Sequence, residues 1–364
     1  MNKKKTRCFA LKHQLDCSIN GVFALTFHHR KHFATANLPS IMTPNLKRVS
    51  RIWDQAPHNG FTALTRFQDQ WFCAFREAQS HVSLDGNLRI ITSPDGNAWE
   101  SAALLTSPDQ TLPDVREARF GITPDNRLML VGPAAYRGET IKHQTYAWFS
   151  ENGHDWSKPV AIAGENMWLW GFDWDEGHFY GTGYGCRLSP QQKNPKAGVH
   201  FFHSKDGIHM DRVSPLYQDP QQPNEAAILV ENGVATALIR RELAPGQTSV
   251  PPYNQGTALL AQSTAPFDEW TVRDLGVFFG GPALLRMPNG KLLAAGRSTL
   301  GKHRTMLWEI DEVNAVPHQL LELPSGGDTG YPGLVWCEDA LWMSYYSSHE
   351  AKTAVYLAEI EFLK

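Results

Sequence analysis

The sequence has no run of about 20 apolar residues, the length that a membrane-spanning helix needs. It also lacks a basic excess, because 34 lysines and arginines face 37 aspartates and glutamates. We therefore expect no membrane span and no nucleic-acid partner. No His, Cys, Asp or Glu residues stand at the spacing of a metal centre, so we expect no metal and no cofactor. Calcium bound by scattered oxygens stays open.

Cysteine is scarce as well. The five residues are odd in number and share no repeated spacing: Cys8, Cys17, Cys73, Cys186 and Cys337. Such a set argues against a disulfide framework and against a zinc knuckle. We therefore predict that these cysteines are unpaired thiols.

The N-terminus lacks a clear targeting signal. The basic start MNKKKTR is typical of a secretory signal, but the apolar run at 21–27 is short and leads directly into HHRKH. A secreted or periplasmic protein, a misplaced start codon and a disordered leader all stay open. We treat residues 1–45 as a leader and residues 46–364 as the folded domain. The sequence gives no indication of the oligomeric state.

Helical patterns are missing beyond residue 46. Instead, short apolar or alternating runs such as RLMLVG, VATALIRR and KLLAAGR are separated by Gly, Asn, Asp and Pro. Runs of this length and pattern predict β-strands. The chain is therefore expected to be all-β.

One short motif recurs along the chain. SPDGNAW at 93–99 is followed by SENGHDW at 150–156, SKDGIHM at 204–210 and a weaker copy, STAPFDEW, at 263–270. The first serines are 57, 54 and 59 residues apart, which indicates a repeat architecture. Asp and Gly favour a hairpin turn in which Ser and Asp bind the local backbone, with Trp as an apolar anchor beneath it.

The repeats predict a closed ring. Each holds about four strands, and the units run over 58–110, 111–165, 166–222, 223–277, 278–326 and 327–364. The last unit is one strand short, and LKRVSRIW at 46–53 is a strand without a unit. If the two pair, the ring closes and its exposed edges are removed. We predict a six-bladed β-propeller of four-stranded antiparallel blades, closed by an N-terminal strand that joins the last blade.

The repeated turns resemble the Asp boxes (BNR repeats) of the sialidase, or neuraminidase, superfamily, whose members are six-bladed propellers that cleave sialic acid glycosides. The resemblance covers residues 46–364, although Asp boxes also occur in propellers with other activities. It implies three arginines that bind the substrate carboxylate, a Tyr nucleophile activated by a Glu, and an acid that protonates the leaving oxygen. Guanidinium suits the first task because its fork matches a carboxylate.

The fourth unit carries two matches. In PNEAAILVENGVATALIRRE, Glu225 precedes Arg240 by 15 residues, with one hairpin between them. The resemblance implies that Glu225 is the base that activates the tyrosine and that Arg240 is a carboxylate ligand. The alternative is a surface Glu and a solvated Arg, but a Glu that opens an apolar strand is an unusual solvated charge.

The fifth and sixth units continue the family order. Arg297 ends the apolar strand of KLLAAGRST and resembles the third arginine of the clamp, the alternative being a surface Arg at the strand end. Tyr331 in GGDTGYPGL resembles the nucleophile, the alternative being a packed core tyrosine. The chain order Glu225, Arg240, Arg297, Tyr331 favours the functional interpretation.

The first unit departs from the family pattern. Phe61 of NGFTAL stands where the first arginine is expected, so the clamp lacks one member. Arg76 matches an arginine that often ends the second strand. Asp85 lies near the position of the family's acid, but its LDGN context also fits a plain turn. His81 follows Arg76 in the loop expected to face the centre, and imidazole can act as acid or base near neutral pH.

The second unit offers arginines that could replace the missing one, and the third unit offers a candidate for stacking on a sugar. In PDVREARF, strand alternation would place Arg116 on one side with Asp114, and Arg119 on the other with Glu117. Either arginine could replace the missing one, and we favour Arg116; internal ion pairing is the alternative. Trp170 is our candidate for a sugar-stacking side chain, because it opens the innermost strand of the third unit.

These residues predict an exo-glycosidase that hydrolyses a glycoside of an acidic sugar, sialic acid or a relative. Tyr331 would be the nucleophile, Glu225 its base and His81 or Asp85 the acid; the substrate-binding residues would be Arg240, Arg297, Trp170 and either Arg76 or Arg116. Two alternatives stay open. A propeller polysaccharide lyase would use His81 on uronic acids, and a carbohydrate-binding propeller would have no activity.

Overall fold

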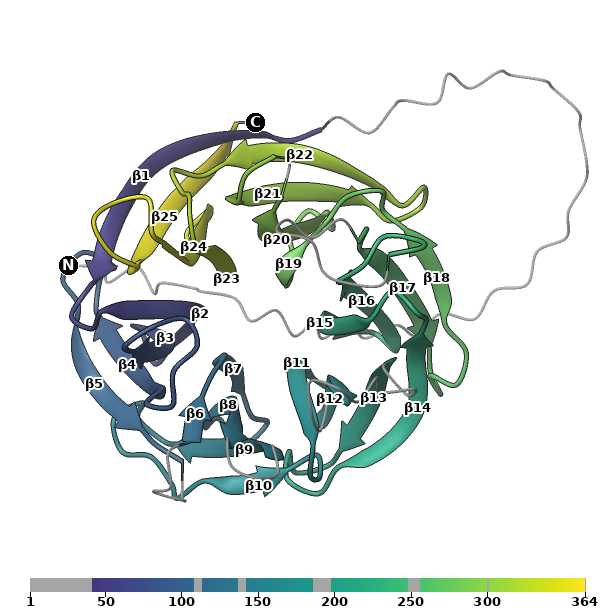
Figure 1. The fold of residues 1–364 in the computed structure, drawn as a ribbon, viewed down its shortest axis with the longest axis horizontal. Helices are drawn as coiled ribbons and strands as arrows, with labels where there is room; N and C mark the ends of the chain where they lie inside the picture. The colour runs from purple at the N-terminus through teal and green to yellow at the C-terminus, as the bar shows by residue number, and fades with distance from the viewer. Residues whose placement is uncertain are drawn as a thin grey trace, which may run out of the picture.

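The computed structural model describes residues 41–107, 113–136, 142–185, 198–247, 256–299 and 301–363. These residues form 25 strands and no helix, and the strands make six antiparallel sheets arranged in a ring (Figure 1). The predicted all-β, six-bladed propeller is therefore confirmed. No helix in this part of the chain is long and apolar enough to cross a membrane. Nearly all of the predicted leader lies outside the described residues.

Four blades follow the regular order, with the innermost strand first. Blade 1 holds β2 (His58–Phe67), β3 (Gln70–Ala78), β4 (Asn87–Ser93) and β5 (Glu100–Leu105). Blade 3 holds β11 (Met167–Asp175), β12 (His178–Gly185), β13 (Gly198–Ser204) and β14 (Asp211–Gln218). Blade 4 holds β15 (Pro223–Glu231), β16 (Val234–Arg241), β17 (Leu259–Thr264) and β18 (Thr271–Asp274). Blade 5 holds β19 (Gly280–Arg286), β20 (Leu292–Ser298), β21 (Arg304–Asp311) and β22 (Val316–Glu322).

Blade 2 has an interrupted innermost strand. Two short strands, β6 (Pro113–Val115) and β7 (Arg119–Ile122), both pair with β8 (Leu128–Tyr136), which continues to β9 (Lys142–Ser150) and β10 (Val160–Ile162). Residues 116–118 lie in the break between β6 and β7. Strand alternation therefore does not apply there. Arg116 lies 3.4 Å from Asp114, as the predicted sorting implies, but it also lies 3.6 Å from Glu117, so the prediction of two separate pairs is wrong for Glu117.

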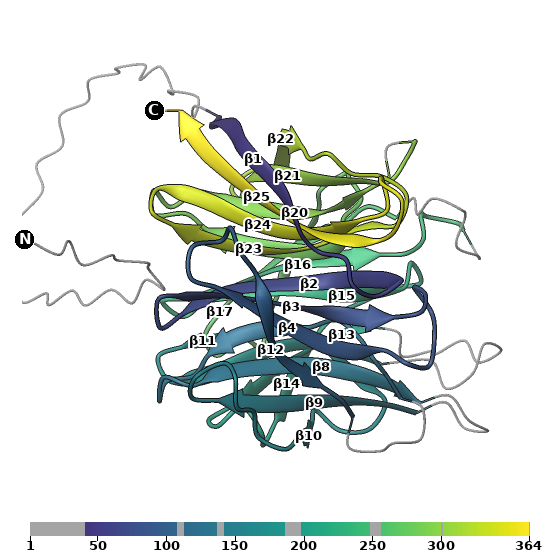
Figure 2. The same ribbon diagram turned by 90° about the vertical axis from the view of Figure 1, so that its left-hand side faces the viewer.

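Blade 6 closes the ring. It consists of β23 (Thr329–Cys337), β24 (Ala340–Ser347), β25 (Ala354–Leu363) and the N-terminal strand β1 (Thr43–Trp53). Strand β1 runs antiparallel to β25 from Thr43 opposite Leu363 to Trp53 opposite Val355 (Figure 2). The predicted closure is confirmed, and β1 begins slightly before the boundary predicted at residue 46.

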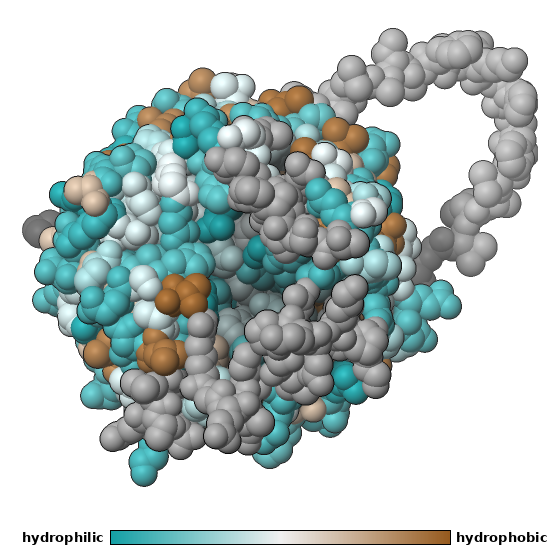
Figure 3. All heavy atoms as spheres, viewed as in Figure 1, coloured by the Kyte–Doolittle hydropathy of each residue, from teal (hydrophilic) through white to brown (hydrophobic). Residues whose placement is uncertain are grey.

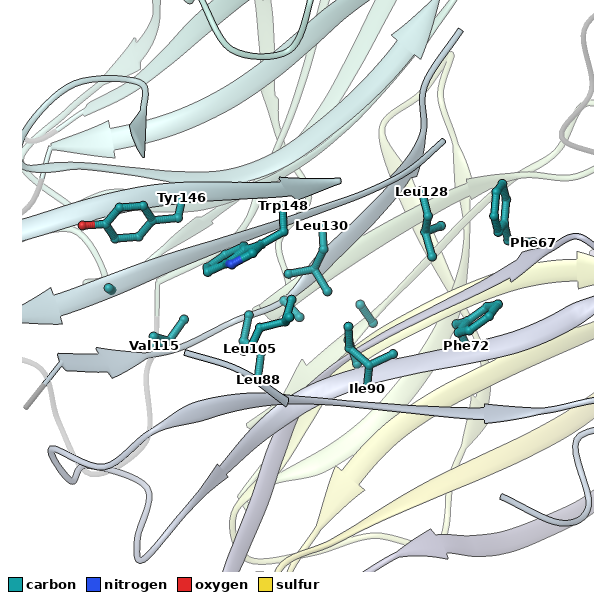
Figure 4. Packing of buried hydrophobic residues seen from close by; sticks show 14 residues of the cluster. Phe67, Phe72, Leu88, Ile90, Leu105, Val115, Leu128, Leu130, Tyr146 and Trp148 are labelled. Carbon is teal, nitrogen blue, oxygen red and sulfur yellow. The ribbon is translucent and has the colours of Figure 1, made fainter. Parts of the chain in front are cut away.

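Apolar side chains fill the space between neighbouring blades. Between blades 1 and 2, Leu88 and Ile90 of β4 share a buried cluster with Leu128 and Leu130 of β8 (Figure 4). Trp148 belongs to the same cluster and is 1% exposed. Hydrophobic residues on the outside are scattered over the face seen in Figure 3 and do not gather in one patch. The blades are therefore held together mainly by burial of apolar surface.

The repeated turns share one hydrogen-bond pattern. The backbone N–H of the glycine donates to the serine Oγ at 2.9 Å for Gly96 and Ser93, 2.8 Å for Gly153 and Ser150, and 3.0 Å for Gly207 and Ser204. The half-buried Trp99 and Trp156 donate from Nε1 to the carbonyls of the glycines, at 3.2 and 3.0 Å. The structural role predicted for these turns is confirmed. The fourth copy differs, since Ser263 Oγ donates to the Glu269 carbonyl at 2.6 Å.

Each of the three turns also packs on the preceding blade. A Cβ added to Gly153 of blade 2 would lie 2.3 Å from Cζ of Phe72 in blade 1. Gly207 of blade 3 meets Met129 of blade 2, and Gly96 of blade 1 meets Trp342 of blade 6. In blades 1, 2 and 3 the motif therefore contacts the preceding blade as well as closing its own turn.

The cysteines only partly follow the prediction. Cys73 is a buried free thiol, but Cys337 is disulfide-bonded. The prediction of unpaired thiols is wrong for Cys337, because a disulfide depends on which residues the fold brings together. Cys8, Cys17 and Cys186 lie outside the described residues.

Candidate functional site

Every innermost strand is irregular near its start, where the strands come closest to the ring axis. Five have a shift in strand register, between Gly60 and Ala63, Leu169 and Gly171, Pro223 and Ala226, Gly280 and Ala283, and Gly330 and Gly333. The sixth, in blade 2, is broken at 116–118. Bulges re-aim side chains and are frequent beside active sites. The residues placed at these points are Phe61, Glu117, Trp170, Glu225, Gly281 and Tyr331.

Tyr331 and Glu225 meet at the centre. The Tyr331 hydroxyl donates to Glu225 Oε1 at 2.7 Å, and Arg240 Nη1 lies 2.6 Å from the same carboxylate oxygen. Arg240 Nη1 also donates to the Tyr331 hydroxyl at 3.2 Å, while its Nη2 pairs with Glu242 at 2.7 Å. The structure thus brings together three residues that the sequence singles out.

The electrostatics of this group keep the tyrosine protonated and the glutamate ionised. Burial, with Glu225 nearby, raises the pKa of Tyr331 far above its usual range. Burial alone would raise the pKa of Glu225 too, but Arg240 and the other hydrogen-bond donors outweigh it and hold that pKa below its ordinary value. Glu225 is therefore an ionised acceptor for the hydrogen bond from the protonated Tyr331 hydroxyl.

Gly281 makes room for the tyrosine. Its backbone N–H donates to Glu225 Oε2 at 2.8 Å. It has φ of +59°, and an added Cβ would lie 2.4 Å from Cγ of Tyr331. Tyr331 itself has φ of +51°, a left-handed conformation that is uncommon for a bulky residue. Backbone strain of this kind clusters at functional sites.

Arg297 stands on the other side of Tyr331. Its guanidinium lies over the tyrosine ring, 5.4 Å from the centroid. It donates to the Thr329 carbonyl, to Asp328 Oδ1 at 3.0 Å and to the Tyr346 hydroxyl at 2.8 Å. Tyr346 in turn donates to Asp328 Oδ1 at 2.8 Å. Arg297 therefore belongs to the site, but it already has a carboxylate partner.

Two histidines share the second oxygen of Asp328. His81 Nδ1 lies 2.7 Å and His58 Nε2 lies 2.9 Å from Asp328 Oδ2. Burial opposes ionisation of Asp328, but hydrogen bonds from His58 and His81, with Arg297, hold its pKa well below the usual range. Because an ionised carboxylate accepts only, each histidine donates through the named nitrogen. Nε2 of His81 is then the nitrogen left for proton transfer, and this side chain is 41% exposed.

The same trio could be considered as a metal site, which the sequence analysis does not predict. The ligand atoms of His58, His81 and Asp328 all lie within 4.8 Å of one another. However, Arg297 already neutralises Asp328, and the other nitrogen of His58, Nδ1, is buried without a hydrogen-bond partner among the residues that the structure describes. A metal-binding histidine usually donates its second N–H to an acceptor. The trio therefore fits a hydrogen-bonded network better than a metal centre.

Phe61 fills the place where the first arginine is expected. It is fully buried, with φ of +63°. Its ring lies 4.9 Å from that of Tyr331 and 5.1 Å from that of His81. The Arg116 guanidinium lies 5.0 Å from the Phe61 ring centroid, which brings this arginine from blade 2 toward the missing position.

Blade 2 contributes three charged side chains from its strand break. Arg116 Nη1 lies 3.4 Å from Asp114, and Arg116 Nε lies 3.6 Å from Glu117 Oε1. The other Glu117 oxygen, Oε2, is buried and has no hydrogen-bond partner among the described residues, and the same holds for Arg119 Nη2. Burial raises the pKa of Glu117, and Glu225 adds to this effect while Arg116 opposes it.

Arg76 and Asp85 have local partners. Arg76 is fully buried; it binds Asp114 at 2.6 Å and the carbonyls of Ser80 and Ser83. It thus holds the loop that carries His81 and the break in blade 2. The exposed Asp85 accepts the Gln79 N–H at 3.1 Å within that loop, which favours the turn role considered for it.

Trp170 lies at the centre but offers no open face. It is 1% exposed, its ring edge meets Tyr331 at a centroid distance of 5.5 Å, and Arg119 covers it at 4.3 Å. This arrangement favours a role in packing over one in stacking on a sugar.

Several residues of the site are not predicted from the sequence. Asp328, His58, Tyr346 and Glu242 have no motif of their own, although Asp328 and His58 each lie close before a residue that the analysis considered, Tyr331 and Phe61. Glu117 and Arg119 are visible in PDVREARF, but their meeting with Trp170 and Glu225 depends on the strand break.

Solved structures with this fold include several glycosidases. A protein of unknown function from Dyadobacter fermentans superposes with a TM-score of 0.73 at 16% identity, over 90% of this chain and 100% of that one. The GH93 α-L-arabinofuranosidase of Fusarium graminearum, solved with arabinobiose, gives 0.67 at 10%, over 85% and 96%. Trypanosoma rangeli sialidase, solved with the inhibitor DANA, gives 0.60 at 12%, over 84% of this chain and 55% of that one. At these identities the similarity establishes a shared propeller fold.

Neither protein-family models nor curated proteins give a match to this chain.

Proposed function

We propose that this protein is a glycoside hydrolase that releases an acidic sugar, sialic acid or a related one, from the end of a glycoconjugate. The observation that carries the proposal is the buried hydrogen bond from Tyr331 to Glu225, flanked by Arg240 and Arg297. A Tyr paired with an ionised Glu at the centre of a propeller is a nucleophile with its base. A neutral nucleophile also avoids repulsion by an anionic sugar.

In the first step, Tyr331 Oη attacks the anomeric carbon while its proton passes to Glu225 Oε1. The glycosidic bond breaks, and the leaving oxygen takes a proton from His81 Nε2. In the second step, a water attacks the same carbon, gives a proton to His81 and displaces Tyr331, which recovers its proton from Glu225. Atoms and protons balance, and the enzyme returns to its starting state.

Asp328 would position the acid. Its hydrogen bond to His81 Nδ1 fixes the imidazole tautomer and would stabilise the imidazolium before proton donation. Arg297 and Tyr346 hold the other Asp328 oxygen, so the carboxylate is clamped on both sides. This network favours His81 over Asp85 as the proton donor.

A second candidate is a lyase that acts on uronic acids. The half-exposed His81, held by Asp328, could remove a proton next to a carboxylate neutralised by an arginine. This reaction needs no covalent bond to Tyr331 and yields an unsaturated sugar. A carbohydrate-binding propeller without activity is less well supported, since binding alone has no need for a Tyr–Glu pair.

The test offers the purified protein an aryl glycoside of sialic acid, an aryl α-L-arabinofuranoside as a neutral counterpart, and uronate-containing oligosaccharides. Aryl release from the acidic substrate alone supports the proposal. A new absorbance from a 4,5-double bond assigns the protein to the lyases. Aryl release from the arabinofuranoside alone would show a glycosidase with a neutral substrate, and no reaction with any of the three favours the binding propeller.

A further inference from the structure

The arginines of the site differ in how far their charge is already neutralised. On the side of blades 4 to 6, Arg240 pairs with Glu225 and Glu242, and Arg297 pairs with Asp328. Two guanidiniums thus face three carboxylates among the described residues. A substrate carboxylate placed there would compete with internal partners at 2.6 to 3.0 Å and would meet net negative charge.

Blade 2 has the opposite balance. Its Arg116 and Arg119, together with Arg76 of blade 1, lie beside two carboxylates, Asp114 and Glu117, and Asp114 is shared between Arg76 and Arg116. Among the described residues, Arg119 has no ion-pair partner within 4 Å; its Nη1 donates to the Ala118 carbonyl at 2.7 Å, and its Nη2 is buried without an acceptor. Buried donors without an acceptor are rare in folded proteins, and a ligand is one explanation for them. Arg240 Nε is also buried without a partner among the described residues, but the Arg240 guanidinium already pairs with two carboxylates, so the two arginines differ in their ion pairs.

Arg119 and Arg116 are each separated from the proposed nucleophile, Tyr331, by one aromatic side chain. Arg119 covers the face of Trp170 at 4.3 Å, and the edge of Trp170 meets Tyr331. Arg116 lies over Phe61 at 5.0 Å, and Phe61 meets Tyr331 from another side. A sugar held at blade 2 would therefore stay next to the Tyr331 hydroxyl.

We propose that Arg116 and Arg119 of blade 2 bind the carboxylate of the substrate, with Glu117 beside them, while Arg240 and Arg297 position Tyr331, Glu225 and Asp328. This inference rests on the proposed function for the identity of the reacting group. It assigns the specificity for an acidic sugar to the one blade whose innermost strand is broken.

Glu117 fits this place beside a bound carboxylate only as a neutral acid. Its unpartnered Oε2 is buried, and Glu225 lies close enough to disfavour a second negative charge. A carboxylic acid kept neutral in this way can donate a hydrogen bond to an anion, as neutral carboxyl groups do in oxyanion sites.

The experiment compares an aryl glycoside of the acidic sugar with the methyl ester of the same compound, which has no charge. Arg119→Gln should lower kcat/KM for the acid by about 10- to 100-fold and leave the ester nearly unchanged, since it removes a charge-assisted hydrogen bond. Arg297→Gln should lower kcat for both substrates by a similar factor. The reverse pattern, with charge selectivity lost in Arg297→Gln and kept in Arg119→Gln, would overturn the inference.

Direct binding separates this inference from the proposed function. Calorimetry with the free acidic sugar should show weaker binding to Arg119→Gln than to the wild type. A wild type that binds the acid through Arg119 but cleaves nothing retains the inference and refutes the hydrolase. A wild type that cleaves acid and ester equally well retains the hydrolase and refutes the inference, as does a wild type that binds no acidic sugar.

Discussion

Tyr331 donates a hydrogen bond to Glu225 at 2.7 Å, although 106 residues separate them in the chain. The two residues come from the innermost strands of blades 6 and 4, and both stand at a bulge. The glycine at the bulge of blade 5, Gly281, leaves the space in which they meet. The geometry of the pair therefore depends on three consecutive blades, 4 to 6.

Tyr331→Phe should abolish turnover, with kcat reduced by about 10³-fold or more, because no other group would form the bond to the sugar. The fold should survive, since Glu225 keeps Arg240 and the Gly281 N–H as partners. Initial rates with the aryl glycoside measure the effect. Tyr345→Phe is the matched control: Tyr345 is equally buried, but its hydroxyl donates to the Pro324 carbonyl. An active Tyr331→Phe variant would refute the nucleophile assignment.

His81→Gln should affect substrates according to their leaving group. An aryl group with an acidic phenol leaves without protonation, so its kcat/KM, which reports the first step alone, should fall by less than about 10-fold, whereas kcat/KM for a sugar or alkyl leaving group should fall by about 10²- to 10⁴-fold. Comparing the two rates in one variant cancels any effect on folding. Equal losses on both substrates would show that His81 is not the acid. Asp85→Asn serves as the control, because the Asp85 carboxylate acts within its own loop.

Gly153→Ala should destabilise the fold without changing KM. The new Cβ would lie 2.3 Å from Phe72 at the contact of two blades, and overpacking of this kind costs about 1–3 kcal/mol. Gly177→Ala provides the control, because Gly177 has a similar φ of +82° but no atom within 4 Å of the added Cβ. Thermal unfolding of the two variants separates packing from backbone strain. Equal losses of Tm would mean that the turn does not join the blades through this contact.

The sequence predicts the ring well because each blade repeats local signals. Alternating strands, Ser93 to Gly96 and its copies, and the unpaired strand that became β1 are all visible within a few residues of one another. Tyr331, Glu225, Arg240 and Arg297 are found because their order and spacing resemble a known pattern. The position of Asp328 against His58 and His81 is not predictable this way, since three separate segments converge there.

The pairing of arginines with carboxylates in blade 2 is also not predictable from the sequence. Asp114 and Glu117 stand beside Arg116 and Arg119 in the sequence, and alternation alone sorts them into two pairs. The break at 116–118 brings Glu117 toward Arg116 and leaves Arg119 Nη2 without an acceptor in the described part of the chain. A single irregular strand thus determines which of these charged side chains meet.

Asp173 should make the stability of the fold depend on pH. Its Oδ2 accepts the Val230 N–H at 2.9 Å and so joins blade 3 to blade 4. Burial raises the pKa of Asp173 to about 7, whereas an unfolded chain has an Asp pKa of about 3.9. Between these values the native state binds more protons than the unfolded state, so stability should fall as the pH rises from about 4 to about 7.

Asp173→Asn should remove this component, because an amide does not titrate. We expect the Tm of the wild type to fall by roughly 2–5 °C more than that of the variant between pH 4.5 and pH 7.5. Thermal unfolding followed by circular dichroism at closely spaced pH values measures the difference, with the exposed Asp69→Asn as the control. If the two curves stay parallel over this range, Asp173 is ionised in the native state and its carboxylate, not its acid form, accepts the Val230 N–H.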